Sequence, residues 1–232
     1  MKTHIVTSEQ VKDGKYIGEV DLSNFDGHIE IEADLGTVYF SGQLAATGYI
    51  WAEADSSIEA DSSIKAGWGA TAGGYIKAGG SIDADYTIKA SGSVEAGDSI
   101  TAGDDIEARG PIKAGNYIIA GSSIVAGRSI EAGYYIRAGR SIKSGAGIQS
   151  QLGITCKLTI NCGMRIFAGL CSWRDPDQSE TEIRCGKLES GEVAFGTLIE
   201  TGLPNAEVNQ PDPAQMTIEE RLARLETLAA IK

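Results

Sequence analysis

The sequence predicts an all-β protein, a three-sided parallel β-solenoid of about 18 residues per coil, followed by a short C-terminal α-helix. Three observations lead to this fold class. A six-residue phrase repeats through more than half of the chain, a small side chain returns at a fixed place in the phrase, and the charges of successive repeats alternate in sign. The handedness of the solenoid stays open.

The repeat of six residues runs through residues 38–171. Stepping by six from Ile58, the first position holds Ile or Val as far as Ile166, except at Ala70, which makes nineteen hexads. Three earlier hexads join after a two-residue insertion, and they begin at Val38, Leu44 and Ile50. No hexad can bury its aliphatic side chain alone, so the hexads must stack on one another.

Each hexad reads as one short strand and one corner. The first and third side chains point inward, since strand side chains alternate between faces. The third position is Ala from Ala60 to Ala138 and stays small afterwards. Gly usually follows, and we expect it to supply the positive φ of a sharp corner. Examples of this corner Gly are Gly67, Gly79, Gly103, Gly127 and Gly139, while Asp61 and Asp85 replace it elsewhere.

The outward residue between the two inward ones indicates how many hexads make one coil. From Glu59 onward it alternates largely between acid and base. Coils of two or four hexads would stack like charges about 4.8 Å apart, which is repulsive. Coils of three hexads bring opposite charges together, namely Glu59 with Lys77, Lys65 with Asp83, Lys77 with Glu95, Lys89 with Glu107, Glu95 with Lys113 and Lys113 with Glu131. Twenty-two hexads then predict about seven coils.

The hexads of residues 38–171 resemble those of the hexapeptide-repeat β-helix proteins, many of which are acyltransferases, and more loosely those of bactofilin-like polymer-forming proteins. In the acyltransferase pattern the small inward residue stands two positions before the large aliphatic, whereas here Ala stands two positions after Ile. The resemblance implies a His base, for which this chain offers His4 and His28, both before the regular hexads. We expect the architecture without the enzyme activity.

Both ends of the chain depart from the hexads. Residues 1–37 are predicted to form an acidic cap with the first rungs. Residues 172–203 are predicted to form an irregular C-terminal cap, with rungs at Ile183, Leu188, Val193 and Ile199 and packing residues Phe167, Trp173 and Phe195. Residues 204–215 have the Pro and polar content of a linker.

A helix is predicted over residues 216–232. Thr217 and Glu220 have the spacing of a capping box. Its apolar residues lie on one stripe, Ile218, Leu222, Leu225 and Ala229. Because so short a helix is marginal alone in water, we expect it to dock, either on its own solenoid or on another subunit.

Two surface features are candidate partner-binding sites. At one corner, coils of about 18 residues stack Tyr117 with Tyr135 and Tyr134 with Leu152, beside Ile119 at an outward strand position. Exposed aromatic and aliphatic groups together indicate an interface, although the C-terminal helix could instead cover them. The second feature is the acidic run before the repeats, with Asp26, Glu30, Glu32 and Asp34.

The net charge of −12 argues against direct binding of nucleic acid and favours a basic partner. Acids outnumber bases by 9 to 3 in residues 1–54, by 11 to 9 in residues 55–150 and by 12 to 8 in residues 151–232, giving −6, −2 and −4. No apolar run of about 20 residues and no signal-peptide pattern occurs, so we expect a cytoplasmic protein, in the host cytoplasm if phage-encoded.

The cysteines and glycines show no cofactor or metal motif. Cys156, Cys162 and Cys185 fall in the small inward position and are expected to be buried thiols. The Cys-x₂-Cys spacing of zinc sites is absent, and the glycines follow the corner period, not a phosphate-binding motif. We therefore expect neither a cofactor nor a metal.

These observations favour a non-enzymatic protein-interaction module, a rigid acidic solenoid that inhibits or adapts a protein partner. A phage or mobile-element inhibitor of a nucleic-acid-binding host defence complex, of the anti-CRISPR kind, fits by analogy with pentapeptide-repeat proteins that mimic DNA. The alternative is a self-assembling structural scaffold, and a hexapeptide acyltransferase is more remote. We expect a homo-oligomer, dimeric or trimeric.

Overall fold

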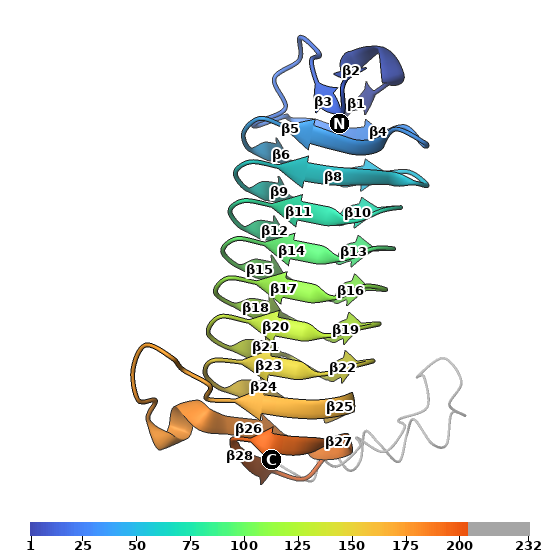
Figure 1. The fold of residues 1–232 in the computed structure, drawn as a ribbon. Coiled ribbons are helices and arrows are strands. Elements are labelled where there is room, and N and C mark those ends of the chain that lie inside the picture. Colours follow the sequence, from blue (N-terminus) through green and yellow to red (C-terminus); the bar gives the residue numbers. More distant parts are fainter. Residues whose placement is uncertain (204–232) are drawn as a thin grey trace, which may run out of the picture. The chain divides into compact units, whose positions relative to one another are not determined.

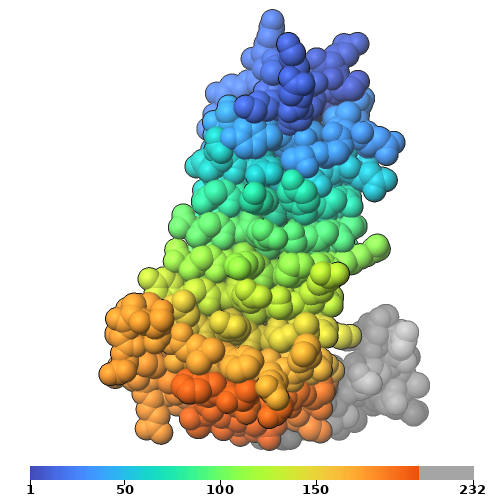
Figure 2. Space-filling model, viewed as in Figure 1, coloured from blue at the N-terminus to red at the C-terminus, as the bar shows by residue number. Residues whose placement is uncertain are grey.

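The computed structural model describes residues 1–203, and residues 1–202 form one compact unit, an elongated column of stacked coils (Figure 1). The column is narrowest at its N-terminal end and widest near its C-terminal end, where a segment projects to one side (Figure 2). The predicted parallel β-solenoid is confirmed, with three short strands in each regular coil. The predicted linker 204–215 and helix 216–232, with Ile218, Leu222, Leu225 and Ala229, lie outside the described residues.

Three ladders of strands form the faces of the column. The first contains β1 (Lys2–Val6), β4 (Gly27–Ile31), β7 (Ile50–Ala52), β10 (Ala70–Ala72), β13 (Ile88–Ala90), β16 (Ile106–Ala108), β19 (Ile124–Ala126), β22 (Ile142–Ser144), the start of β25 (Thr159–Ala168) and the start of β27 (Lys187–Phe195). The second contains β5 (Gly36–Phe40), β8 (Ser56–Ala60), β11 (Ile76–Ala78), β14 (Val94–Ala96), β17 (Ile112–Ala114), β20 (Ile130–Ala132), β23 (Ile148–Ser150) and the ends of β25 and β27. The third contains β6 (Leu44–Ala46), β9 (Ile64–Ala66), β12 (Ile82–Ala84), β15 (Ile100–Ala102), β18 (Ile118–Ala120), β21 (Ile136–Ala138), β24 (Ile154–Cys156), β26 (Glu182–Cys185) and β28 (Thr197–Glu200).

Each regular strand pairs in register with the strand one coil later. Ile76 lies opposite Val94, and Val94 opposite Ile112, a step of eighteen residues each time. In the first coils Ile50 lies opposite Ala70, a step of twenty, because of the two-residue insertion before β8. The solenoid has more than the seven predicted coils, since β1 and β4 extend it at one end and β26 to β28 at the other.

The core is a column of aliphatic side chains. Every first-position Ile or Val from Ile58 to Ile166 is 0% exposed, and the small residues two places later are at most 8% exposed. Burial of one large aliphatic side chain stabilises the fold by about 1.5–3 kcal/mol. Late in the chain Ser144 takes the small position, and its hydroxyl donates to the carbonyl oxygen of Arg128 at 2.7 Å, so its burial leaves no unpaired polar atom.

The reason expected for the corner glycines is wrong. None of Gly67, Gly79, Gly103, Gly127 and Gly139 has a positive φ, and neither has Asp61 or Asp85. The coils stack so closely here that a Cβ would run into the backbone of the preceding coil, eighteen residues earlier, or twenty at Gly67. At Gly79 it would overlap the carbonyl oxygen of Asp61 and lie 3.0 Å from the carbonyl carbon. Close approach of backbones, not left-handed geometry, selects Gly at these corners.

The outward charges align between coils as predicted. Glu59 and Lys77 form an ion pair of 2.8 Å, Lys89 and Glu107 one of 2.8 Å, and Lys113 and Glu131 one of 3.5 Å. The other three predicted pairs are also register partners, without an ion pair within 4.0 Å, and they are Lys65 with Asp83, Lys77 with Glu95 and Glu95 with Lys113. Exposed pairs of this kind contribute at most about 1 kcal/mol each.

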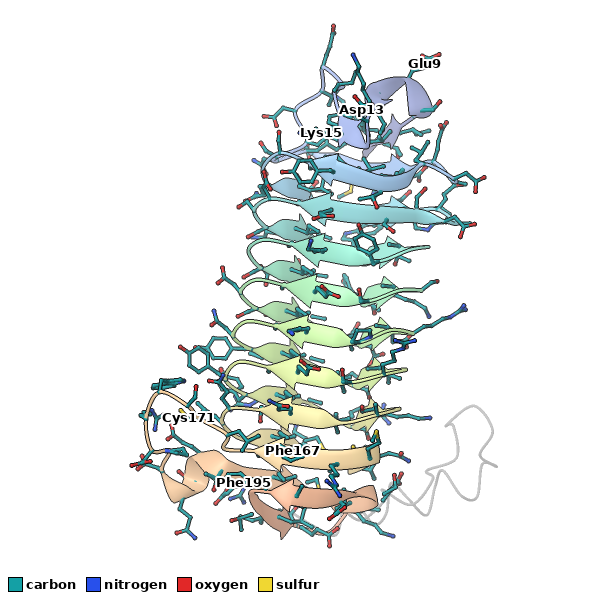
Figure 3. The ribbon with its side chains drawn as sticks, viewed as in Figure 1. Glu9, Asp13, Lys15, Phe167, Cys171 and Phe195 are labelled. Carbon is teal, nitrogen blue, oxygen red and sulfur yellow. The ribbon has the colours of Figure 1, made fainter. Side chains whose placement is uncertain are left out.

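A cap closes the N-terminal end of the column. It consists of β1, the 3-10 helix η1 (Ser8–Gln10) and the antiparallel hairpin of β2 (Val11–Lys12) and β3 (Lys15–Tyr16). Val6 at the end of β1 is buried, and so are Leu22 and Phe40. Glu9, Asp13 and Lys15 mark this end in Figure 3.

The C-terminal rungs form, but the packing predicted for them is partly wrong. Trp173 and Phe195 are 54% and 48% exposed, because they lie on the projecting 169–181 loop and on the last coil (Figure 3). Leu198, not Ile199, lies opposite the buried Ile183. The loop contains the 3-10 helix η2 (Gln178–Thr181) and is held by Arg174, whose guanidinium lowers the pKa of Glu180 to about 2.

Candidate functional site

The structure brings the predicted tyrosine corner together. The ring centroid of Tyr117 lies 4.5 Å from that of Tyr135 and 5.3 Å from that of Tyr134. The amide of Leu152 donates to the carbonyl oxygen of Tyr134, which stacks these two residues as expected. Ile119 follows Tyr117 by two residues and lies between Thr101 and Arg137 of the neighbouring coils.

This tyrosine corner is partly covered by the chain itself. The ring of Trp173, from the 169–181 loop, meets Tyr134 edge-on with centroids 5.9 Å apart, and its Nε1–H donates to Gln151 at 3.0 Å. The Arg137 guanidinium lies over the Tyr135 ring, 5.3 Å from its centroid. All three tyrosines are half-buried. The surface thus offers less free area than the sequence suggests, whatever the role of residues 216–232.

The four predicted acidic residues lie along and beside β4, in the first full coils. Asp26 accepts a hydrogen bond from the Thr47 hydroxyl at 3.0 Å, before the strand begins. Glu30 is outward on the strand and accepts from the Tyr49 hydroxyl. Glu32 follows the strand, and the exposed Asp34 has a positive φ of 61° at the next corner. The structure therefore spreads these carboxylates over one strand and its two ends.

An exposed aromatic surface beside Glu30 was missed from the sequence. Trp51 is 43% exposed, Trp68 45% and Tyr86 57%. Tyr49 joins them from the same coil as Trp51, and its ring stacks on His28 with centroids 4.1 Å apart. Large apolar side chains so exposed, side by side on consecutive coils, are typical of an interaction surface.

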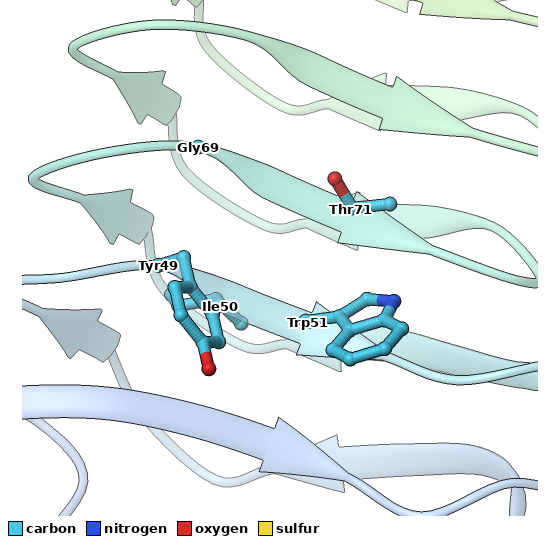
Figure 4. Close-up of a pocket in the computed structure, with 5 residues that line it drawn as sticks. All are labelled: Tyr49, Ile50, Trp51, Gly69 and Thr71. Atoms are coloured by element: carbon cyan, nitrogen blue, oxygen red, sulfur yellow. The ribbon is translucent and has the colours of Figure 1, made fainter. Parts of the chain in front are cut away.

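Two adjoining shallow hollows lie among these rings, and we call them together the aromatic notch. Tyr49, Gly69 and Thr71 line both hollows, Trp51 completes one of them, and Trp68 and Tyr86 complete the other. The hollow lined by Tyr49, Trp51, Gly69 and Thr71 has a volume of about 380 Å³. Figure 4 shows Tyr49 and Trp51 on one coil and Gly69 and Thr71 on the next.

The local sequence explains why the notch forms. Gly69 stands in the corner column between Tyr49 and Thr87, so the column lacks one side chain. A Cβ at Gly69 would lie 3.0 Å from the Thr87 carbonyl oxygen. Trp68 occupies the corner just before Gly69, and the next hexad begins with Ala70 in place of the usual Ile. These two adjoining irregular hexads were the signal that could have located the notch.

Both histidines are engaged within the N-terminal coils. The Tyr49 amide donates to Nδ1 of His28 at 3.1 Å. Nε2 of His4 lies 3.2 Å from the Tyr16 hydroxyl, and burial lowers the pKa of His4. These contacts give both imidazoles a packing role.

Three of the four cysteines are buried free thiols, as predicted. Cys156, Cys162 and Cys185 all lie in the core, and burial raises the pKa of Cys156 to about 12. A thiol with so high a pKa is a poor nucleophile at neutral pH. Among residues 1–203, no three His, Cys, Asp or Glu side chains gather as metal ligands would.

Comparison with known proteins adds no functional information. No protein-family model matches the chain, and no curated protein or solved structure is significantly similar to it. Within the described residues, no helix has the length and apolar character needed to cross a membrane.

Proposed function

We propose that the protein is a non-enzymatic interaction module, which presents a preformed surface on its first coils to a protein partner and thereby inhibits or adapts that partner. The observation that carries the proposal is the aromatic notch beside Glu30. Exposed Trp and Tyr rings are the side chains that most often dominate protein interfaces. The packed core beneath them holds the rings in place, which lowers the entropy lost on binding.

The partner that we propose has a basic surface. Residues 1–54, which include Glu30 and Trp51, have a net charge of −6, half of the total for the chain. Charge complementarity speeds association and selects the partner. Nucleic-acid-binding proteins have basic surfaces, so a host defence complex targeted by a phage or mobile-element inhibitor, of the anti-CRISPR kind, belongs to this class. We propose a dimer or trimer acting in the cytoplasm.

Affinity enrichment from host extract tests this function. The wild-type chain is compared with the double variant W51A/W68A and with W173A, which removes the third exposed Trp from the far end of the column. We expect a partner that is retained by wild type and W173A, lost from W51A/W68A and released by salt. The purified partner must then bind directly. Equal retention by all three proteins would contradict the proposal.

A self-assembling scaffold is the second candidate function. The last coil favours it, because Phe195 and Leu198 are 48% and 37% exposed at the C-terminal end of the described column. Open solenoid ends can join through their strand edges. Continued growth needs both ends, however, and the cap of β1 to β3 covers the other end. Light scattering behind size exclusion distinguishes the two, since a scaffold forms long polymers and a module a discrete species.

A further inference from the structure

We propose that the aromatic notch binds an arginine side chain from a basic segment of the partner. This inference rests on the proposed function and adds the chemistry of the residue that is recognised. A guanidinium fits both the shape of the notch and the acidic groups beside it, and other ligands that stack on aromatic rings fit only one of the two.

The shape of the notch suits a flat group. The missing side chain at Gly69 opens a gap in the corner column, and Gly69 lines both hollows of the notch, one with Trp51 and the other with Trp68 from the next coil. A guanidinium is planar and weakly hydrated, so it stacks on aromatic faces, whereas the ammonium of Lys is compact and strongly hydrated. The notch is also shallow and open to solvent, so a side chain can enter it without a change of the backbone.

The charged groups beside the notch favour a cation. Glu30 lies opposite Trp51 in the strand ladder and accepts from the hydroxyl of Tyr49, which lines the notch. On the other side Lys89 lies opposite Thr71, but it forms an ion pair with Glu107 at 2.8 Å, so its charge is largely offset. A guanidinium has five N–H donors and can both stack on a ring and donate to a carboxylate.

Other ligands that stack on aromatic rings fit less well. Nucleic-acid bases stack on Trp and Tyr, but their phosphates are repelled by the acids of the first coils. A neutral sugar can lie on the same rings but gains nothing from the charge of Glu30. A basic protein segment is the ligand for which both the rings and the carboxylate contribute.

Titration of the full-length protein with two synthetic peptides tests the inference, one of alternating Arg and Gly and one of alternating Lys and Gly, equal in length and charge. Two of the three Trp residues, Trp51 and Trp68, line the notch, so their fluorescence reports occupancy. We expect the Arg peptide to bind about tenfold more tightly than the Lys peptide. W68A should weaken Arg-peptide binding by about tenfold or more, while W173A leaves it unchanged.

Glu30→Gln separates charge from shape, since it keeps the size of the side chain and removes its charge. We expect weaker binding of the Arg peptide and a smaller dependence on salt. Unchanged folding of each variant is checked by circular dichroism.

Three results would overturn the inference: equal affinity for the two peptides, Arg-peptide binding that survives W51A/W68A, or binding of a neutral oligosaccharide such as maltohexaose in place of the Arg peptide. The proposed function fails separately. A natural partner that is lost with W51A/W68A while the Arg peptide does not bind would overturn the arginine inference and leave the interaction module standing.

Discussion

Replacing Gly121 by Ala tests the explanation given for the corner glycines. Gly121 follows β18, where an added Cβ would overlap the carbonyl oxygen of Gly103 and lie 2.8 Å from its carbonyl carbon. Overpacking of this kind costs about 1–3 kcal/mol. In a chain of this size each kcal/mol lowers Tm by about 2–4 °C, so we expect a fall of about 2–12 °C.

Gly42→Ala is the matched control, because a Cβ at Gly42 meets nothing within 4 Å. It should leave Tm unchanged or raise it slightly, since Ala restricts the unfolded chain. Thermal scans followed by far-UV circular dichroism compare the two variants with the wild type. Hydrogen exchange gives a second readout, because a side chain at this corner accompanies a longer hydrogen bond between coils. The amide of Arg109 donates to the carbonyl oxygen of Ala90 at 3.2 Å, whereas that of Gly121 donates to the carbonyl oxygen of Ala102 at 3.0 Å. The same Tm for both variants, with no faster exchange at position 121, would refute the close-approach explanation.

Four further predictions concern the core, the charges, the thiols and the C-terminal segment. Ile112→Ala, at a side chain that is 0% exposed, should lower the free energy of unfolding in urea by about 2–5 kcal/mol. Lys89→Glu places a second acid beside Glu107 and should lower the free energy of unfolding by less than about 1 kcal/mol, an effect that 1 M salt removes. Burial raises the pKa of Cys156 to about 12 in the fold, whereas an unfolded thiol has a pKa of about 8.5. The stability that the neutral thiol contributes is therefore complete below pH about 8.5 and is lost as the pH rises from there to about 12. Cys156→Ala should reduce the fall of the urea midpoint over that pH range. A chain ending at Leu203 should keep its β-sheet circular dichroism. Light scattering then compares its number of subunits with that of the full chain: a smaller oligomer means that residues 204–232 join subunits, and an unchanged oligomer means that they cap their own chain.

The architecture could be predicted because its constraints repeat. An Ile buried every six residues sets the strand and corner, and opposite charges eighteen apart then admit one coil size, which the pairing of Ile76 with Val94 confirms. The corner glycines show where local reasoning fails. Their requirement comes from a backbone eighteen residues away, which is visible only once the coils are stacked. Conformational preference of a single residue is therefore a poor guide at such a corner.

The candidate site was predicted less well for the same physical reason. The tyrosine corner follows from the coil period, and the structure places Tyr117, Tyr134 and Tyr135 together. The aromatic notch depends on the longer first coils, where the insertion shifts Tyr49 to the place above Gly69. A strict eighteen-residue count does not bring these two residues together. The cover that Trp173 supplies comes from a loop outside the repeat, so periodicity could not reveal it either.

The uniform coils also set the distance between surfaces at different heights of the column. The aromatic notch and the tyrosine corner lie on the same scaffold, separated by regular coils that pair only with their neighbours. Insertion or removal of one 18-residue unit, such as Ile88–Asp105, would change the distance between the two surfaces by about one strand spacing, 4.8 Å, and leave each surface intact. Duplication of a coil would thus change the spacing of the two surfaces without altering the residues of either.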